Sequence, residues 1–137
     1  TYTLSLHDAL PICPLPIADG TLEYTLCLGT ANRHSLRIHT AGNARSFRIV
    51  VSATQIEIAK NPEQGETQAT TLARVPLSLK RGTWYPLRVT FTGNEATAQI
   101  GGATAKANHA VFAETKEVLH LLVFQGDAGF RDLAVVR

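Results

Sequence analysis

Alternation between apolar and polar residues runs through most of this chain and constrains its fold more than any other feature. In residues 22–28, LEYTLCL, every second position is a leucine or a tyrosine. Alternate side chains of a β-strand point to opposite faces, so this pattern predicts antiparallel strands with one buried face. The same period of two recurs in the stretches 36–39, 47–51, 56–58, 87–91, 96–100 and 119–124.

Turn signals separate these stretches at short intervals. They include Asp19-Gly20, Gly42-Asn43, Asn61-Pro62, Arg81-Gly82, Gly93-Asn94, Gly101-Gly102 and Gly126-Asp127. Glycine, proline and asparagine at such spacing are typical of tight connections between strands. No window of helical length has a 3.6-residue period. The sequence therefore predicts an all-β protein of about eight short strands, arranged as a sandwich or a barrel, with residues 63–73 as a long loop or weak edge strand.

The N-terminal segment YTLSLHDALPI, residues 2–12, matches without a gap the translation of a common sequencing-library adapter. We therefore interpret residues 1–13 as an artefact and 14–137 as a single domain truncated at its N-terminus. On this interpretation His7 and Asp8 carry no functional weight, and Cys27 is the one secure native cysteine. We expect the prefix to lie at a sheet edge or to be poorly ordered.

Composition removes several classes of protein. Hydrophobic residues make up 45 % of the 137 residues, which excludes wholesale disorder and provides for one real core. No apolar run approaches the ~20 residues of a membrane helix. A net charge of +2 is too mild to indicate nucleic-acid binding. One secure cysteine excludes an intrachain disulfide framework, and no Cys/His cluster indicates zinc. The oligomeric state stays open.

The stretch 33–48 is basic: it holds four arginines and two histidines and no acid. If its two strands pair around Gly42-Asn43, then Arg37, His39 and Arg48 gather on one exposed face. Such a face can hold an anionic or hydroxyl-rich ligand. The alternative is a solvated face balanced by Glu23 and Glu57 on neighbouring strands. We take Arg37, His39, Arg48 and Glu57 as candidate ligand-binding residues.

The pair Trp84-Tyr85 is the other candidate, because aromatic rings stack on sugars. We interpret Trp84 as an anchor of the core. Tyr85 remains open between the core and the ligand, and it completes the set of candidate ligand-binding residues.

Catalytic and metal chemistry finds little support. A glycosidase needs two carboxyls across the sugar bond, and the acids here are scattered. No nucleophile elbow and no metal-ligand spacing occur, so the catalytic residues are unknown and no metal or cofactor is assigned. A structural calcium ion in the loop at Asp127 is left as an alternative.

Three segments together resemble concanavalin A-like sandwich domains, including the laminin-G-like and 3-keto-disaccharide hydrolase-like groups: LPIADGTLEYTLCL, LKRGTWYPLRVTFTGNEATAQIGG and LHLLVFQGDAGFRDLAVVR. The resemblance implies an antiparallel jelly-roll sandwich, often exported and associated with carbohydrate-degrading machinery. Gly82, Trp84 and Phe130 match structural positions of these families. The defining strands of the hydrolases are not found, so no catalytic residue is carried over.

Three functional hypotheses follow. The first is a non-catalytic, extracytoplasmic module that binds a saccharide through a polar, partly aromatic face. The second is a fragment of a 3-keto-disaccharide hydrolase-like enzyme, which requires a pocket where at least two of His34, His39, Arg37, Arg48 and Glu57 converge. The third is a structural or interaction domain that uses sheet edges or loops.

Overall fold

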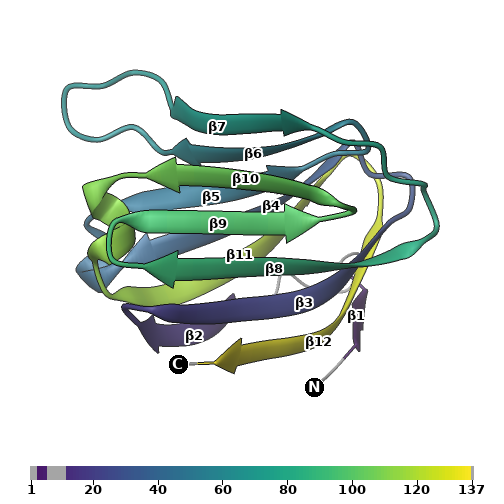
Figure 1. Cartoon of the computed structure of the whole chain (residues 1–137), viewed down its shortest axis with the longest axis horizontal. Coiled ribbons are helices and arrows are strands. Elements are labelled where there is room, and N and C mark those ends of the chain that lie inside the picture. Colours follow the sequence, from purple (N-terminus) through teal and green to yellow (C-terminus); the bar gives the residue numbers. More distant parts are fainter. Residues whose placement is uncertain (1–2, 6–11, 137) are drawn as a thin grey trace.

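The computed structural model describes residues 3–5 and 12–136, and it has two antiparallel six-stranded sheets packed face to face (Figure 1). The front sheet in that view has the order β1-β12-β3-β8-β9-β10, and the back sheet has the order β2-β11-β4-β5-β6-β7. The prediction of an all-β sandwich is confirmed. The front strands are β1 (Thr3–Ser5), β12 (Ala128–Val136), β3 (Gly20–Leu28), β8 (Trp84–Thr92), β9 (Glu95–Ile100) and β10 (Ala103–Asn108). The back strands are β2 (Ile12–Ile17), β11 (Lys116–Phe124), β4 (Arg33–Thr40), β5 (Ser46–Val51), β6 (Gln55–Lys60) and β7 (Thr70–Pro76).

The core lies between the sheets and is built by the alternation itself. The apolar positions of each alternating stretch are buried, and the polar positions between them face outward. Phe47 of the back sheet packs against Phe91 of the front sheet and against Phe112, with ring centroids 5.6 and 5.0 Å apart. Phe112 belongs to η2 (Ala110–Ala113), a 3-10 turn that covers one end of the sandwich.

The hairpin of β4 and β5 forms as predicted. Its connection is the 3-10 turn η1 (Ala41–Asn43), in which Gly42 has a φ of +68°. This left-handed conformation is open to glycine at little cost. The hairpin register places Arg37 directly opposite Arg48. The two arginines therefore share the outer face of the back sheet.

The N-terminal prefix lies partly within the described residues. β1 is an edge strand of the front sheet and pairs with β12, which agrees with the expected edge position for residues 3–5. His7 and Asp8 lie outside the described residues. The origin of the prefix remains a prediction.

Trp84 corrects the sequence interpretation, because it lies on the outer face of the front sheet and not in the core. Its Cα pairs with Cys27, whose other neighbour is Gly129. The guanidinium of Arg131 lies 4.2 Å from the centroid of the indole ring. The reason is parity: Leu87 is buried, and a residue three positions away on the same strand points to the opposite face.

Gly129→Ala tests this placement. A Cβ at position 129 would lie 2.8 Å from Cη2 of Trp84, so the indole must move away from the sheet. We expect a loss of about 1 kcal/mol in the free energy of unfolding, as for modest overpacking. Trp84 is the only tryptophan, so its emission should also shift to the red as the ring gains solvent. An unchanged emission maximum with unchanged stability would contradict the placement.

Candidate functional site

The strongest candidate site is a pocket of about 420 Å³ on the outer face of the back sheet. Three of the predicted ligand-binding residues line it: Arg37 from β4, Arg48 from β5 and Glu57 from β6. They meet because all three occupy outward positions of adjacent antiparallel strands. The pocket is also lined by Asn32, Arg33, Ser35, Val50, Ser52, Gln55, Arg74 and Phe124.

The registers of the paired strands place the residues on this outer face in rows that cross the sheet. In one row His120, Arg37, Arg48 and Ala59 lie side by side across four strands. The adjacent row runs from Leu122 through Ser35, Val50 and Glu57 to Arg74.

Glu57 is engaged at the far wall of the pocket. Its Oε2 accepts from Nη2 and Nε of Arg74 at 2.7 and 3.0 Å. The Glu57 side chain is 13 % exposed, and that of Arg74 is 56 % exposed, so the pair is partly shielded from water. Glu57 is the only carboxylate among the residues that line the pocket.

The opposite wall carries polar groups without partners. The Nε atoms of Arg37 and Arg48 and the Oγ of Ser35 are buried, and none has a hydrogen-bond partner. Arg33 lies over the ring of Phe124, 4.5 Å from its centroid. This wall therefore contains buried donors that have no acceptor in the described part of the protein.

His39 lies on the same outer face but does not line the pocket. Its ring centroid is 4.9 Å from that of His120. Partial burial lowers the pKa of His39, and the neighbouring His120 and Arg37 lower it further. We expect His39 to be neutral near pH 7 and to be able to accept or donate a hydrogen bond beside the pocket.

Tyr85 and His34 lie elsewhere. Tyr85 has the same parity as Leu87, so it packs against the core from the front sheet, and its hydroxyl accepts from the backbone N–H of Lys80 at 2.9 Å. His34 points inward from β4 and is fully buried. The structure therefore brings together three of the five residues predicted to bind a ligand, with His39 nearby and Tyr85 apart.

Sequence reasoning missed several lining residues. Ser35 could have been found, because it has the same parity as Arg37 on the same strand. Arg74 and Phe124 could not, because they reach the pocket only through the pairing of β7 with β6 and of β11 with β4.

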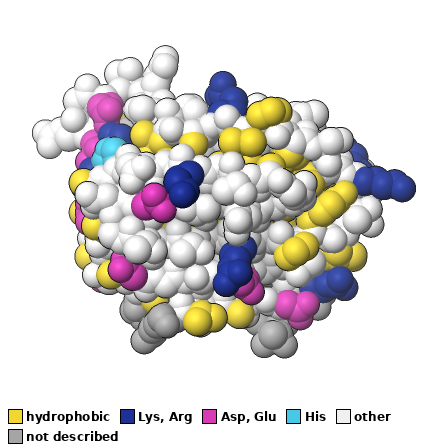
Figure 2. Space-filling model, viewed as in Figure 1, with side chains coloured by type: hydrophobic (Ala, Val, Ile, Leu, Met, Phe, Trp, Pro, Cys, Tyr) yellow, Lys and Arg dark blue, Asp and Glu magenta, His cyan; other side chains and the backbone are white. Residues whose placement is uncertain are grey.

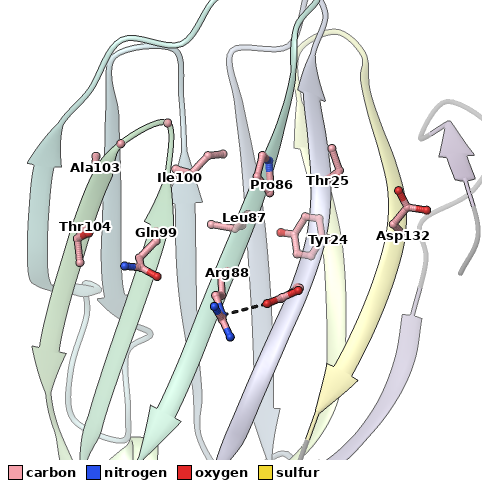
Figure 3. Close-up of a pocket in the computed structure, with 13 residues that line it drawn as sticks. Tyr24, Thr25, Pro86, Leu87, Arg88, Gln99, Ile100, Ala103, Thr104 and Asp132 are labelled. Atoms are coloured by element: carbon pink, nitrogen blue, oxygen red, sulfur yellow. Dashed lines mark ion pairs between the residues drawn. The ribbon is translucent and has the colours of Figure 1, made fainter.

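A second, more open depression of about 600 Å³ lies over the front sheet (Figure 3). Its main charged pair is Arg88 with Glu23, at 2.9 Å. Lys106 and Glu95 form another pair on this sheet, 3.8 Å apart, and basic side chains lie beside acidic ones across this face (Figure 2). The charges of the front sheet are thus compensated by one another, in contrast to Arg37 and Arg48.

Metal ligands do not gather in the part of the chain that the structure describes: no three His, Cys, Asp or Glu residues lie close enough to hold an ion. Oδ1 of Asp127 accepts from the backbone N–H of Thr30 at 2.9 Å, which joins two loops. Within residues 3–5 and 12–136, no helix has the length and apolar character needed to span a membrane.

Comparison with solved structures shows the fold. The carbohydrate-binding module CBM66 from Bacillus subtilis is 15 % identical, with a TM-score of 0.71 over 94 % of this chain and 78 % of that one. Galectin LEC-6 of Caenorhabditis elegans is 10 % identical, with a TM-score of 0.74 over 99 % and 96 %. Lactose- and MES-liganded congerin II is 10 % identical, with a TM-score of 0.65 over 93 % and 99 %. No model of a protein family matches the sequence, and no curated protein matches it.

Proposed function

We propose that this chain is a saccharide-binding module that holds its ligand in the pocket on the outer face of the back sheet. The observation that carries the proposal is the convergence of Arg37, Arg48 and Glu57, from three adjacent strands, around one pocket of about 420 Å³. That volume is within the range of small-molecule sites. The likeness of the fold to CBM66 and to galectins adds support.

The chemistry of the lining fits a sugar. Arg37, Arg48 and Ser35 offer hydrogen-bond donors, and the Glu57–Arg74 pair and Gln55 can bind hydroxyl groups. Phe124 supplies apolar surface at one side of the pocket, and the guanidinium of Arg33 lies over its ring. Fixed polar groups around a small apolar surface are what a hydroxyl-rich ligand needs.

Val50→Phe tests the proposal without changing the charge of the pocket. Val50 points outward between Ser35 and Glu57, so a phenyl group there would fill the space and leave the core intact. We expect the wild-type protein to bind members of a plant and bacterial glycan array. The variant should bind those glycans about tenfold or more weakly, since the ligand volume is lost.

Thr97→Phe is the matched control, because Thr97 faces outward from β9, between β8 and β10 of the front sheet. It should bind as the wild type does. A glycan array without signal, or equal binding by wild type and Val50→Phe, would refute the location or the function.

A hydrolase of the 3-keto-disaccharide hydrolase-like group is the second candidate, because the same convergence meets the condition stated for it. Glu57 would be its only carboxylate in the pocket, and it is already paired with Arg74. A two-carboxylate mechanism therefore lacks its second group among the lining residues. Release of reducing sugar from a bound glycan, abolished by Glu57→Gln, would favour this candidate over a binding module. The extracytoplasmic location implied by the family resemblance is part of the proposal for either candidate.

A further inference from the structure

Arg37 and Arg48 form a like-charged pair across two adjacent strands. Their Cα atoms are direct partners across β4 and β5. Like charges at directly opposed positions destabilise a sheet. The neighbours that complete their row are His120 and Ala59, so the row contains no acid.

Five of the other described arginines have a carboxylate or carbonyl partner. Arg45, Arg74, Arg88 and Arg131 each lie within ion-pair distance of a carboxylate. Arg81 donates to the carbonyls of Gly29 and Ala31 at 2.9 and 2.6 Å. The described arginines without a carboxylate or carbonyl partner are Arg33, Arg37 and Arg48, and all three line the same pocket.

The pocket also holds buried polar atoms that lack a partner. Ser35 is 2 % exposed, it lines the pocket, and its Oγ has no hydrogen-bond partner. The Nε atoms of Arg37 and Arg48 are buried in the same way. A buried donor without an acceptor costs free energy, and an oxyanion in the pocket relieves that cost by accepting from the guanidinium groups and the hydroxyl.

The one acid that lines the pocket, Glu57, does not neutralise Arg37 and Arg48. Glu57 is diagonal to Arg48 on the neighbouring strand, but it forms its ion pair with Arg74 on the other side. One wall is thus an uncompensated cationic pair and the other wall is a compensated pair. A ligand that matches both walls has an anionic group at one end and hydroxyl groups at the other.

We infer that the ligand is an acidic saccharide, whose carboxylate or sulfate lies between Arg37 and Arg48 and next to Ser35. The inference rests on the proposed function and adds the chemical class of its ligand. Guanidinium groups match planar and tetrahedral oxyanions with two parallel hydrogen bonds, which an ammonium group cannot reproduce.

The test compares three oligosaccharides of equal length by isothermal titration calorimetry: an oligogalacturonate, a sulfated galactan and a neutral galactan. The wild type should bind at least one acidic oligosaccharide about tenfold or more tightly than the neutral one, the effect of one charge-assisted contact. Whichever acidic oligosaccharide binds more tightly shows whether the arginines bind a carboxylate or a sulfate. Affinity should fall as NaCl is raised from about 20 to about 200 mM, since screening weakens the contact.

Variants separate this contact from general attraction to a basic protein. Arg37→Gln/Arg48→Gln should lose the preference for the acidic ligand, and Arg48→Lys should keep the charge but lose part of the affinity. Arg88→Gln, which removes a charge from the front sheet, should bind as the wild type does. The Tm of the double variant should stay equal or rise, because a like-charge contact is removed.

Three outcomes count against the inference, and they can be told apart. If the neutral galactan binds as tightly as both acidic ligands, and the double variant binds like the wild type, the acidic class is wrong and the proposed function stands. If a folded wild type binds none of the three, and no other glycan on the array, the proposed function falls as well. A double variant with a greatly lowered Tm would show that the arginines are structural and would also count against the inference.

Discussion

Acidification from pH 7 to pH 4 is expected to reduce the free energy of unfolding by about 3 kcal/mol through one buried histidine, His34. Its Nδ1 lies 2.9 Å from the carbonyl oxygen of Leu122. A carbonyl only accepts, so Nδ1 carries the proton, and Nε2 accepts from the hydroxyl of Tyr24. The ring also packs 4.6 Å from Phe130, centroid to centroid. The folded state therefore holds this imidazole neutral.

The sign of the effect follows from the pKa. Burial lowers the pKa of His34 from 6.5 to about 4, although the hydrogen bond to Leu122 opposes the shift. Between these values the unfolded chain binds more protons than the folded protein does. The stability contributed by neutral His34 is therefore complete above about pH 6.5 and is lost as the pH falls toward 4.

Urea unfolding across this pH range measures the effect. His34→Gln keeps an acceptor for Tyr24 and a donor for Leu122 but does not titrate, so its stability should fall much less than that of the wild type. His120→Gln, on the outer face of the back sheet, should retain most of the wild-type slope. Equal pH dependence of the wild type and His34→Gln would show that His34 does not titrate as its burial requires.

The second large effect is a gain of about 2 kcal/mol in stability as the pH rises from 8 to 10, and it comes from Lys116. This lysine is fully buried, and its Nζ donates to the carbonyls of Ala18 and Phe112. The Nζ also lies 4.4 Å from the centroid of the Phe91 ring. Burial lowers the pKa of Lys116 from 10.5 to about 8, against the weaker influence of Asp19 and Glu114.

Here the unfolded chain again binds more protons between the two pKa values, so stability rises with pH in that window. Burial raises the pKa of Tyr24 well above 10, which lowers stability only at still higher pH. Lys116→Met should flatten the rise, whereas Lys106→Met, at an exposed position, should leave it unchanged. Chemical unfolding of the three proteins from pH 7.5 to pH 10 measures this, and a rise that survives in Lys116→Met would exclude Lys116 as its source.

The parity of each strand explains most of what the sequence could predict. The stretch 22–28 is buried and exposed in alternation as expected, and Arg37 and Arg48 share a face because both have the outward parity. The same rule, applied to Leu87 and Trp84, would have placed the indole outside. β10 was not predicted, because Ala103, Ala105 and Ala107 give a weak apolar signal.

Lys116 shows what parity cannot predict. Counting from Leu119, a regular strand would turn Lys116 outward and Glu117 inward. A bulge between Lys116 and Val118 reverses this order, so Lys116 is buried and Glu117 is exposed. Such an irregularity depends on pairing with two other strands, and local sequence carries no clear signal of it. The lining of the pocket could not be predicted in full for the same reason, because Arg74 and Phe124 reach the pocket only through the pairing of their strands with β6 and β4.

The strict alternation of β4, β5 and β6 also makes this protein suitable for engineering. On each strand the core-forming set and the pocket-lining set occupy different positions and do not overlap. A library that randomises the outward positions of these strands would change recognition without requiring the interior to repack. Positions 35, 37, 48, 50, 55 and 57 make up that library. A rigid sheet would thus serve as a template on which new ligand specificities can be selected, much as loops serve in antibodies.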